Sequence, residues 1–320
     1  MWNYLLRRTF EMFLLLLLIS ALVFFILHLT PGGPLDELRM SNPRITREHI
    51  KQLEALLGLD RPIHERYVVW LMNVLRGDWG YSWQLGTGQS VMSLITARVG
   101  NTVLLMAVAL GASIVLAIPI GIYSALRQYS WADHLVTGLS FFGMSMPTFW
   151  FGVMLLIVFA VMLRWFPAGG TSTVGMENDL LDRLRYLVLP ATVLCLFNIA
   201  SWSRYIRSSM LDVLGQDYLR TARAKGLREN VVIVKHALRN ALIPFITMVG
   251  LTLPDLFGGA IITETIFAWA GMGRLYYDAI MASDWPIVQA VMVILAFLVI
   301  ASNLLADVLY AVVDPRIRYD

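Results

Sequence analysis

The sequence predicts an all-α, polytopic membrane protein with six transmembrane helices and with both termini in the cytoplasm. Hydrophobic residues make up 58% of the 320-residue chain, charged residues make up only 15%, and the mean hydropathy is +0.66. Soluble domains carry about 25% charged residues, so this chain is too apolar to be one. Its apolar residues fall in six runs, each near the length of about 20 residues that a helix needs to cross a bilayer.

The first run covers residues 10–29 and follows Arg7 and Arg8. A cleaved signal peptide is the competing interpretation. The run is long for the apolar part of a signal, and the next residues, 30–34 (TPGGP), offer no cleavage site of the A-x-A type. We therefore expect an uncleaved anchor, with residues 1–34 forming the N-terminal tail and the first transmembrane helix.

The segment 35–98 is expected to be extracytoplasmic. Thr46 can cap a first helix, and a second, amphipathic helix is predicted over residues 63–75. Several aromatic residues fit a belt at the membrane interface, namely Trp70, Trp79, Tyr81 and Trp83. A small packed subdomain outside the membrane fits the segment equally well.

The five remaining runs form the predicted core, residues 99–320. They cover residues 99–123, 135–163, 186–206, 241–263 and 287–313. Several prolines fall in or at the ends of these runs, where neighbouring helices can satisfy the freed carbonyl groups; they are Pro119, Pro147, Pro190, Pro244 and Pro254. No internal repeat is evident, so an inverted-repeat carrier gains no support.

The distribution of basic residues predicts the orientation. With the N-terminus inside, thirteen arginines and lysines lie in cytoplasmic segments and four lie in short outer loops. Eight more lie in residues 35–98 and are left out, because long translocated segments escape the charge bias. One cytoplasmic loop, residues 207–240, is especially basic and too large for a plain connector, which suggests a docking surface. Its basic residues are Arg207, Arg220, Arg223, Lys225, Arg228, Lys235 and Arg239.

The sequence lacks the common catalytic motifs. It has no G-x-x-x-x-G-K-[ST] phosphate loop. His64-Glu65 looks like the start of a zinc protease motif, but Val68 stands where the second histidine belongs. The single cysteine, Cys195, lies in an apolar run and is expected to be a packing residue. We therefore predict no catalytic residue, no metal site and no cofactor bound by this chain, and no nucleic-acid partner.

A face of small residues marks the fifth run, where Gly250, Pro254 and Gly258 recur every four residues. Such a face lets another helix approach closely. Asp255 lies beside it, and an ionisable group at the centre of a transmembrane helix costs about 2.5–3.5 kcal/mol, so it should face a cavity or a partner. Ordinary packing within the chain is the alternative. The candidate residues for a translocation path or a helix interface are Ser145, Thr247, Gly250, Thr252, Asp255 and Gly258.

A short helix is predicted inside the basic loop. Residues 216–225 are helix formers, and Gly226 after them suits a left-handed C-cap. The small residues Ala222 and Ala224 would let this helix press into a groove on a partner. Its arginines can pair with acidic groups of that partner or with anionic membrane lipid. A surface amphipathic helix without a partner is the alternative.

Two stretches of the loop closely resemble the EAA-type loop of ABC importer permeases, in the form of the dipeptide/oligopeptide/nickel branch. They are YLRTARAKGL (218–227) and KHALRNALIP (235–244). Further stretches resemble the same branch and extend the resemblance over essentially the whole chain. They are HLTPGGP (28–34), LGLDRP (57–62), LRGDWG (75–80), GGAIITE (258–264) and LLADVLYAVVDPRIR (304–318).

The resemblance implies an ABC type I importer permease fold in a bacterial or archaeal plasma membrane. It implies a permease subunit of an ATP-driven importer, most simply for di- and oligopeptides. A second homologous permease would complete a heterodimeric pore, two ATPase subunits would bind ATP and Mg, and an extracytoplasmic substrate-binding protein would deliver cargo. Nickel chelate, glutathione or an oligosaccharide stay open as cargo, and an ATP-independent secondary carrier or channel stays open as another class.

The resemblance also assigns the residues that couple to the ATPase. They are Asp217, Tyr218, Arg220, Thr221, Ala222, Arg223, Ala224, Lys225 and Gly226. Arg220 stands where the general loop motif begins with glutamate, as is usual in the peptide branch. Gly33 stands where the branch commonly has aspartate and Ala270 where it commonly has proline, so the chain departs from the family pattern at two positions on the outer side.

Overall fold

A computed structural model describes residues 2–29 and 60–313 of the chain. Within these residues the structure is mostly helical, with one isolated antiparallel bridge between Tyr81 and Ser90. The predicted all-α class is confirmed. The helix expected to start at Thr46 and the position of Gly33 lie outside the described residues, so the statements about them stay predictions.

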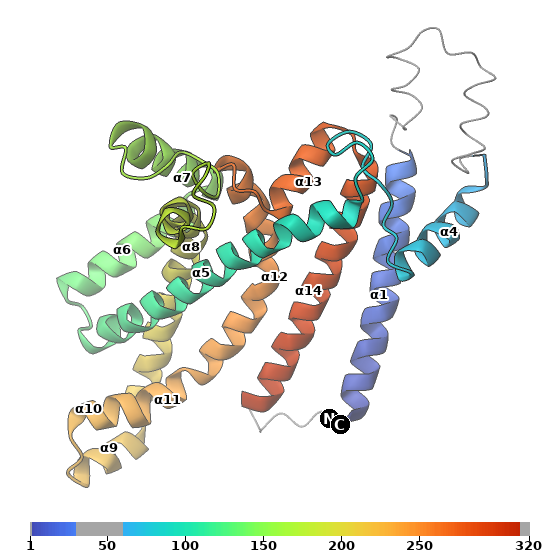
Figure 1. The fold of residues 1–320 in the computed structure, drawn as a ribbon. Helices are drawn as coiled ribbons and strands as arrows, with labels where there is room; N and C mark the ends of the chain where they lie inside the picture. Colours follow the sequence, from blue (N-terminus) through green and yellow to red (C-terminus); the bar gives the residue numbers. More distant parts are fainter. Residues whose placement is uncertain (1, 30–59, 314–320) are drawn as a thin grey trace. The chain divides into compact units, whose positions relative to one another are not determined.

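The helices follow one another along the chain as coloured in Figure 1. They are α1 (Trp2–Leu29), α4 (Ile63–Leu75), α5 (Val91–Leu126), α6 (Trp131–Ser145), α7 (Thr148–Leu155), the π-helix η1 (Leu156–Met162), α8 (Leu180–Leu214), α9 (Asp217–Ala224), α10 (Glu229–Val231), the π-helix η2 (Val232–Ala237), α11 (Leu238–Ala241), α12 (Ile243–Ile266), α13 (Met272–Met281) and α14 (Trp285–Val313).

Four of these helices, α1, α5, α8 and α14, are each long and apolar enough to cross a membrane. Two bent pairs raise the number of candidate spans to six. One pair joins α6 to α7 and η1, and the other joins the segment Glu229–Ala241 to α12. The structure thus allows up to six spans, the predicted number, when each bent pair counts as one. Helix α12 by itself corresponds to the predicted fifth run, 241–263.

The third span departs from the prediction of one continuous run over 135–163. Helix α6 ends at Ser145, α7 begins at Thr148, and the two axes differ by 106°. Met146 and Pro147 between them are extended, with ψ of 133° and 127°. A proline ring disfavours helical geometry in the residue before it and supplies no N–H for the helix, which accounts for the break. By contrast, Pro119 and Pro190 lie inside the continuous helices α5 and α8.

The other predicted boundaries differ in length rather than in kind. The bounds of α4 match the predicted helix 63–75. Helix α5 begins at Val91 rather than at 99, and α8 extends beyond 186–206 at both ends. The length of an apolar run shows only which part of a helix can lie in hydrocarbon. Polar residues can extend the same helix by further turns at either end. Asp179, for example, caps α8 by accepting a hydrogen bond from the Leu181 N–H at 2.9 Å.

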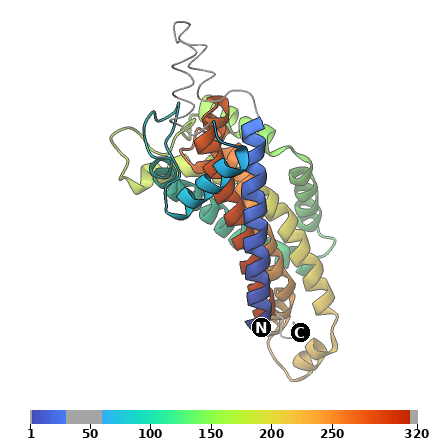
Figure 2. The ribbon, with the colours of Figure 1, turned by 90° about the vertical axis from the view of Figure 1, so that its right-hand side faces the viewer.

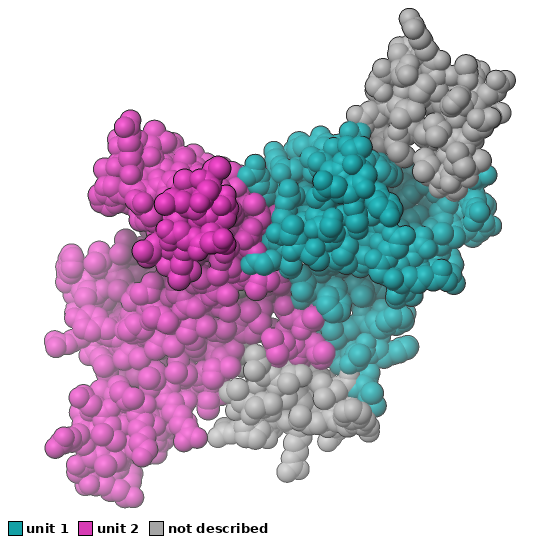
Figure 3. Space-filling view, viewed as in Figure 1, with its two compact units in different colours: residues 1–100, 274–300 teal, residues 101–273, 301–320 magenta. Residues whose placement is uncertain are grey.

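The chain forms two compact units, shown in different colours in Figure 3. Unit 1 comprises residues 1–100 and 274–300, and unit 2 comprises residues 101–273 and 301–320. In unit 1, α4 lies against α1 (Figures 1 and 2).

A fully buried carboxylate, Asp284, holds the loop between α4 and α5 in unit 1. The Ser82 hydroxyl donates to it at 2.5 Å, and the backbone N–H groups of Trp83, Gln84 and Leu85 donate at 3.1, 2.9 and 3.1 Å. Successive N–H groups that converge on one anion form a concave nest. This nest, the residues 82–85 around Asp284, fixes the loop to the residue just before α14.

The core of unit 2 is built around α8. Trp202, Ile206 and Met210 of α8 are almost completely buried, and the Trp202 ring meets Phe245 of α12 in a T-shaped contact at 5.4 Å. Helix α5 approaches α8 closely, because a Cβ at Gly121 would lie 2.7 Å from the Ser203 carbonyl oxygen. Helix α8 therefore connects this core to α9, which follows it in the chain.

Candidate functional site

The helix predicted inside the basic loop is present as α9, and its C-terminal end has the predicted geometry. Gly226 has φ of 78°, in the left-handed region that glycine adopts without strain. Its N–H donates to the Arg223 carbonyl at 2.9 Å, and the Leu227 N–H donates to the Ala222 carbonyl at 3.4 Å. These two bonds are those of a Schellman motif. The predicted left-handed cap at Gly226 is thus confirmed.

The inner face of α9 is anchored in the core of unit 2. Leu219 is fully buried and Ala222 is 7% exposed. Both belong to the cluster that contains Ile206 and Met210 of α8, together with Val232 of η2. The small side chain of Ala222, expected at a partner contact, therefore packs against this chain itself. Helix α9 is held to α8 by apolar contact.

The outer face of α9 presents polar, basic and apolar side chains to the surroundings. Its exposed residues are Asp217, Tyr218, Arg220, Thr221, Arg223, Ala224, Lys225, Gly226, Leu227 and Arg228. Tyr218 and Leu227 expose 42% and 41% of their surface. Exposed tyrosine and arginine side chains are enriched at protein–protein contacts. We call these ten residues the α9 surface.

Polar contacts hold the α9 surface in shape. The Arg223 guanidinium donates two hydrogen bonds to the Glu229 carboxylate of α10, from Nη2 to Oε1 at 2.8 Å and from Nε to Oε2 at 3.1 Å. This contact raises the pKa of the Arg223 guanidinium. Asn240 donates to the Tyr218 hydroxyl at 2.9 Å. Lys225 and Arg228 form no ion pair within the part of the chain that the structure describes, so both cations are available to a partner.

A buried ion pair that the sequence did not reveal joins α6 to α8 in unit 2. Asp133 of α6 is 2% exposed and accepts from Arg207 of α8, Nε to Oδ1 at 2.7 Å and Nη2 to Oδ2 at 2.8 Å. The Ser124 hydroxyl also donates to this carboxylate, and the Tyr129 N–H donates at 2.9 Å. The pair ties α8 to the corner between α5 and α6.

One local signal could have drawn attention to Asp133. Ser130 caps α6 by accepting from the Asp133 N–H at 3.2 Å, and the Ser-x-x-Asp pattern is a sequence signal for the start of a helix. That signal predicts a helix start but not the partner Arg207, which is 74 positions away in the chain. Sequence reasoning had counted Arg207 only as a basic loop residue.

The hydroxyl groups predicted to line a path bond to their own helices. Ser145 at the end of α6 donates to the Phe141 carbonyl at 2.8 Å. Thr252 in α12 donates to the Met248 carbonyl at 2.9 Å. In both bonds the hydroxyl donates to the carbonyl oxygen four residues earlier in the same helix, which gives it a hydrogen-bond partner in an apolar environment.

On the small-residue face of α12, the structure shows how Gly250 packs. Gly250 is buried, and a Cβ there would lie 3.1 Å from the Cβ of Ala306 in α14. Gly250 therefore allows α12 and α14 to pack closely within unit 2. The backbones of Thr247, Asp255 and Gly258 lie in α12, and their side-chain surroundings lie outside the described part of the structure.

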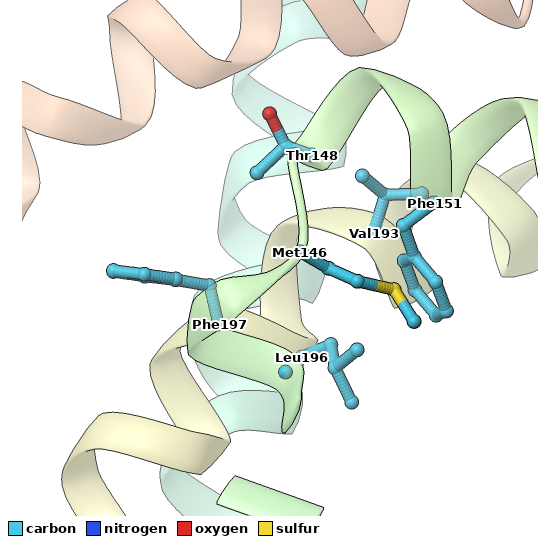
Figure 4. Close-up of a pocket in the computed structure, with 7 residues that line it drawn as sticks. Met146, Thr148, Phe151, Val193, Leu196 and Phe197 are labelled. Atoms are coloured by element: carbon cyan, nitrogen blue, oxygen red, sulfur yellow. The ribbon is translucent and has the colours of Figure 1, made fainter. Parts of the chain in front are cut away.

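A small pocket lies at the bend between α6 and α7 (Figure 4). It encloses about 210 Å³, including the part that is open, and is lined by Gly143, Met146, Thr148, Phe151, Val193, Leu196 and Phe197. The Met146 side chain extends toward Phe151. None of the lining residues is titratable, so this pocket has the character of an apolar cleft.

Comparisons with known proteins agree over the whole chain. The profile of the family described as "Binding-protein-dependent transport system inner membrane component" matches residues 117–319, and the profile of its N-terminal part matches residues 1–106. The chain is 46% identical to the oligopeptide transport system permease protein AppB of Bacillus subtilis, over 99% of both chains. It is 38% identical to the dipeptide transport system permease protein DppB of Escherichia coli, over 94% of both chains.

A solved structure shares the fold at low sequence identity. It is an inward-facing form of the MetNI methionine ABC transporter, with a TM-score of 0.57 and 17% identity, over 70% of this chain and 97% of that chain. At this identity the match concerns the fold alone.

Proposed function

Because the chain belongs to the family of binding-protein-dependent transport system inner membrane components, we propose that it is the permease subunit of an ATP-driven importer of di- and oligopeptides. It forms half of the pore. The observation that carries the cargo assignment is the 46% identity to an oligopeptide permease over 99% of both chains.

In this proposal the α9 surface docks on a cytoplasmic ATPase. The excess of arginine and lysine in residues 207–240 supports a cytoplasmic position for this loop, with both termini on the same side. Tyr218 and Leu227 supply the apolar centre of the contact, and Arg220, Lys225 and Arg228 pair with acidic groups around it.

Motion of the ATPase reaches the pore through buried contacts rather than through chemistry in this chain. Leu219 and Ala222 lock α9 against the end of α8, so the two helices move together. Arg207 lies in the same part of α8, and its ion pair with Asp133 extends the connection to α6. The chain itself contributes no catalytic residue and binds no metal or cofactor, and the ATPase subunits bind ATP and Mg.

The proposed assembly contains this chain, a second homologous permease, two ATPase subunits and an extracytoplasmic substrate-binding protein. It resides in the plasma membrane of a bacterium or archaeon. The many apolar helices support a multi-pass membrane position. The heterodimeric pore follows from the resemblance to the peptide branch.

Uptake by reconstituted vesicles tests the class and the cargo. Proteoliposomes that hold the full assembly, with the binding protein on the outer side, should accumulate labelled di- and tetrapeptides only when ATP is supplied to the ATPases. Peptide uptake driven by an ion gradient through the purified chain alone would overturn the importer. Uptake of nickel chelate, glutathione or an oligosaccharide in place of peptide would overturn the cargo.

A pair of variants at Gly226 tests the docking role separately. A Cβ at Gly226 meets no atom of this chain within 4 Å, so within the chain a substitution there strains the backbone without a steric clash. Valine in the left-handed region costs about 1–3 kcal/mol, whereas asparagine tolerates that region. Gly226→Val should lower uptake relative to ATP hydrolysis, and Gly226→Asn should behave like the parent. Equal coupling in all three proteins would sink the assignment of α9.

A further inference from the structure

Helix α4 in unit 1 has no continuous face of charged or polar side chains along most of its length. Between Arg66 and Arg76 it reads YVVWLMNVL, with Asn73 as the one strongly polar residue. At 1.5 Å per residue, this uncharged stretch of residues 67–75 is about 14 Å long. An amphipathic helix at a membrane surface keeps a charged face in water over its whole length. In α4 the charges instead gather at the two ends.

One side of α4 packs on α1. The Tyr67 hydroxyl lies 2.9 Å from Ser20 Oγ and 3.2 Å from the Leu17 carbonyl oxygen. The rings of Tyr67 and Trp70 lie 5.5 Å and 5.7 Å from the ring of Phe24. Figure 2 shows the two helices side by side. The contact therefore uses the residues 17–24 of α1.

That contact lies deep along a membrane span. The apolar span of α1 runs from Leu6 to Leu29, so Leu17 lies near its middle. From Leu17 to Leu29 the helix rises about 18 Å. A hydroxyl at such a depth needs a partner inside the protein, because hydrocarbon offers none. The Tyr67 hydroxyl has two, Ser20 and the Leu17 carbonyl.

The opposite side of α4 is apolar and exposed. Val68, Val69, Met72 and Leu75 expose 48%, 44%, 54% and 76% of their surface. In water, a contiguous apolar patch of this kind is unfavourable. Helix α1 also exposes Leu22 and Ile26, at 54% and 53%, along the same stretch on which α4 lies. Where no protein covers a transmembrane helix, the medium around its wall is lipid, which is favourable for apolar side chains.

We propose that α4 lies within the half of the bilayer at the Leu29 end of α1, with Val68, Val69, Met72 and Leu75 in contact with lipid acyl chains. The segment after α1 thus supplies a membrane-embedded helix that does not cross the bilayer. The continuity between this face and the exposed wall of α1 favours lipid over another protein as its occupant.

Spin labels along one face of α4 test the proposal. The full chain, purified with its associated subunits and reconstituted in phosphatidylcholine vesicles, carries a Cys195→Ala change that removes its native thiol. Nitroxide labels are then placed singly at Glu65→Cys, Val69→Cys and Met72→Cys, with Ile26→Cys as the reference in the wall of α1. Each label is measured for collisions with oxygen, which concentrates in hydrocarbon, and with a water-soluble nickel chelate.

Labels at positions 69 and 72 should match the label at 26, with a ratio of oxygen to chelate collisions several-fold above that at 65. Chelate collisions at 69 and 72 equal to those at 65 would place the face in water and overturn the proposal. Low collision rates with both reagents would show that protein covers the face, which also overturns it.

A substitution without a label gives a second readout. Met72→Arg places a charge on the proposed lipid face and should reduce the amount of folded chain recovered from membranes several-fold. Met72→Leu preserves the apolar volume and should match the parent. Equal recovery of Met72→Arg and Met72→Leu would contradict a lipid-facing position.

Discussion

Asp133 and Asp284 are both buried carboxylates that fix the start of a helix, yet their charges are satisfied in different ways. Asp133 in unit 2 receives both nitrogens of the Arg207 fork, one on each oxygen. Asp284 in unit 1 receives the Ser82 hydroxyl and three backbone N–H groups. No lysine or arginine pairs with Asp284 within the described residues.

The two arrangements have different structural roles: the ion pair of Asp133 connects two helices, and the nest around Asp284 holds a loop in place. An ion pair joins two distant elements, and each charge depends on the other because a single buried charge is costly. A nest of N–H groups divides the same negative charge among several weak bonds, so the loss of one donor leaves the others in place. The first arrangement suits the proposed transmission along α8, and the second suits a static loop.

Arg207→Met should have the largest effect on stability. It leaves the Asp133 carboxylate buried without its cation, which costs about 3–5 kcal/mol. The free energy of unfolding in detergent, followed by circular dichroism during titration with SDS, measures the loss. Destabilisation below 1 kcal/mol would show that Asp133 does not depend on its cation.

The double variant Asp133→Asn/Arg207→Met is the matched control. It removes both charges, and replacing a whole buried pair by neutral groups is often close to neutral. Its stability should therefore exceed that of Arg207→Met alone. A double variant as unstable as the single one would mean that packing of the arginine stem, rather than charge, holds α8 to α6.

Asp284→Ala should have an intermediate effect. It removes the acceptor of one buried hydroxyl and of three part-buried N–H groups. The buried Ser82 hydroxyl left without a partner costs about 1–3 kcal/mol, whereas water can reach the part-buried N–H groups. The same titration measures the change in unfolding free energy. The loop 82–85 should in addition exchange its amide hydrogens faster with solvent. Unchanged exchange in this loop would contradict the role of Asp284 as a clamp.

Ser82→Ala should cost less than Asp284→Ala, because three N–H groups still hold the carboxylate. Its cost of about 1–2 kcal/mol includes the loss of the acceptor for the Gly86 N–H, which lies 2.8 Å from Ser82 Oγ. Its stability and the amide exchange of residues 82–85 provide the measurement. A loss as large as that of Asp284→Ala would show that the hydroxyl, with its 2.5 Å contact, carries the whole clamp.

Arg220→Gln should have the smallest effect on stability and a distinct effect on function. Arg220 meets Asp217 at 3.5 Å, with side chains 76% and 95% exposed, and an exposed pair of this kind contributes about 0–1 kcal/mol. Unfolding should therefore change little, while peptide uptake by the reconstituted assembly should fall. Unchanged uptake would remove Arg220 from the proposed contact with the ATPase.

Local signals in the sequence predicted the parts of the structure that depend on neighbours in the chain. The bounds of α4 and the left-handed geometry of Gly226 follow from spacing and from the conformational freedom of glycine. The break at Pro147 was missed, since Pro119 and Pro190 carry the same local constraint and yet lie inside helices. Tertiary packing decides which proline ends a helix.

Long-range pairs lay beyond the reach of these signals. Nothing near Asp133 indicates that Arg207 will meet it, and nothing near residues 82–85 indicates the carboxylate of Asp284. For the same reason the inward direction of Ala222 was not predicted: its small size suited a partner groove and the core of its own chain equally well. The direction depends on where α8 places Ile206 and Met210.

The nest around Asp284 also imposes an order on biosynthesis. Ser82 and Asp284 are 202 positions apart, so at about 5–20 residues per second the acceptor is made about 10–40 s after its donors. During that interval the N–H groups of residues 83–85 must bond to water or to a transient partner. The loop can reach its final form only once Asp284, the residue that precedes α14, has been translated, so a residue at the entrance to the last span completes a structure begun about 200 residues earlier.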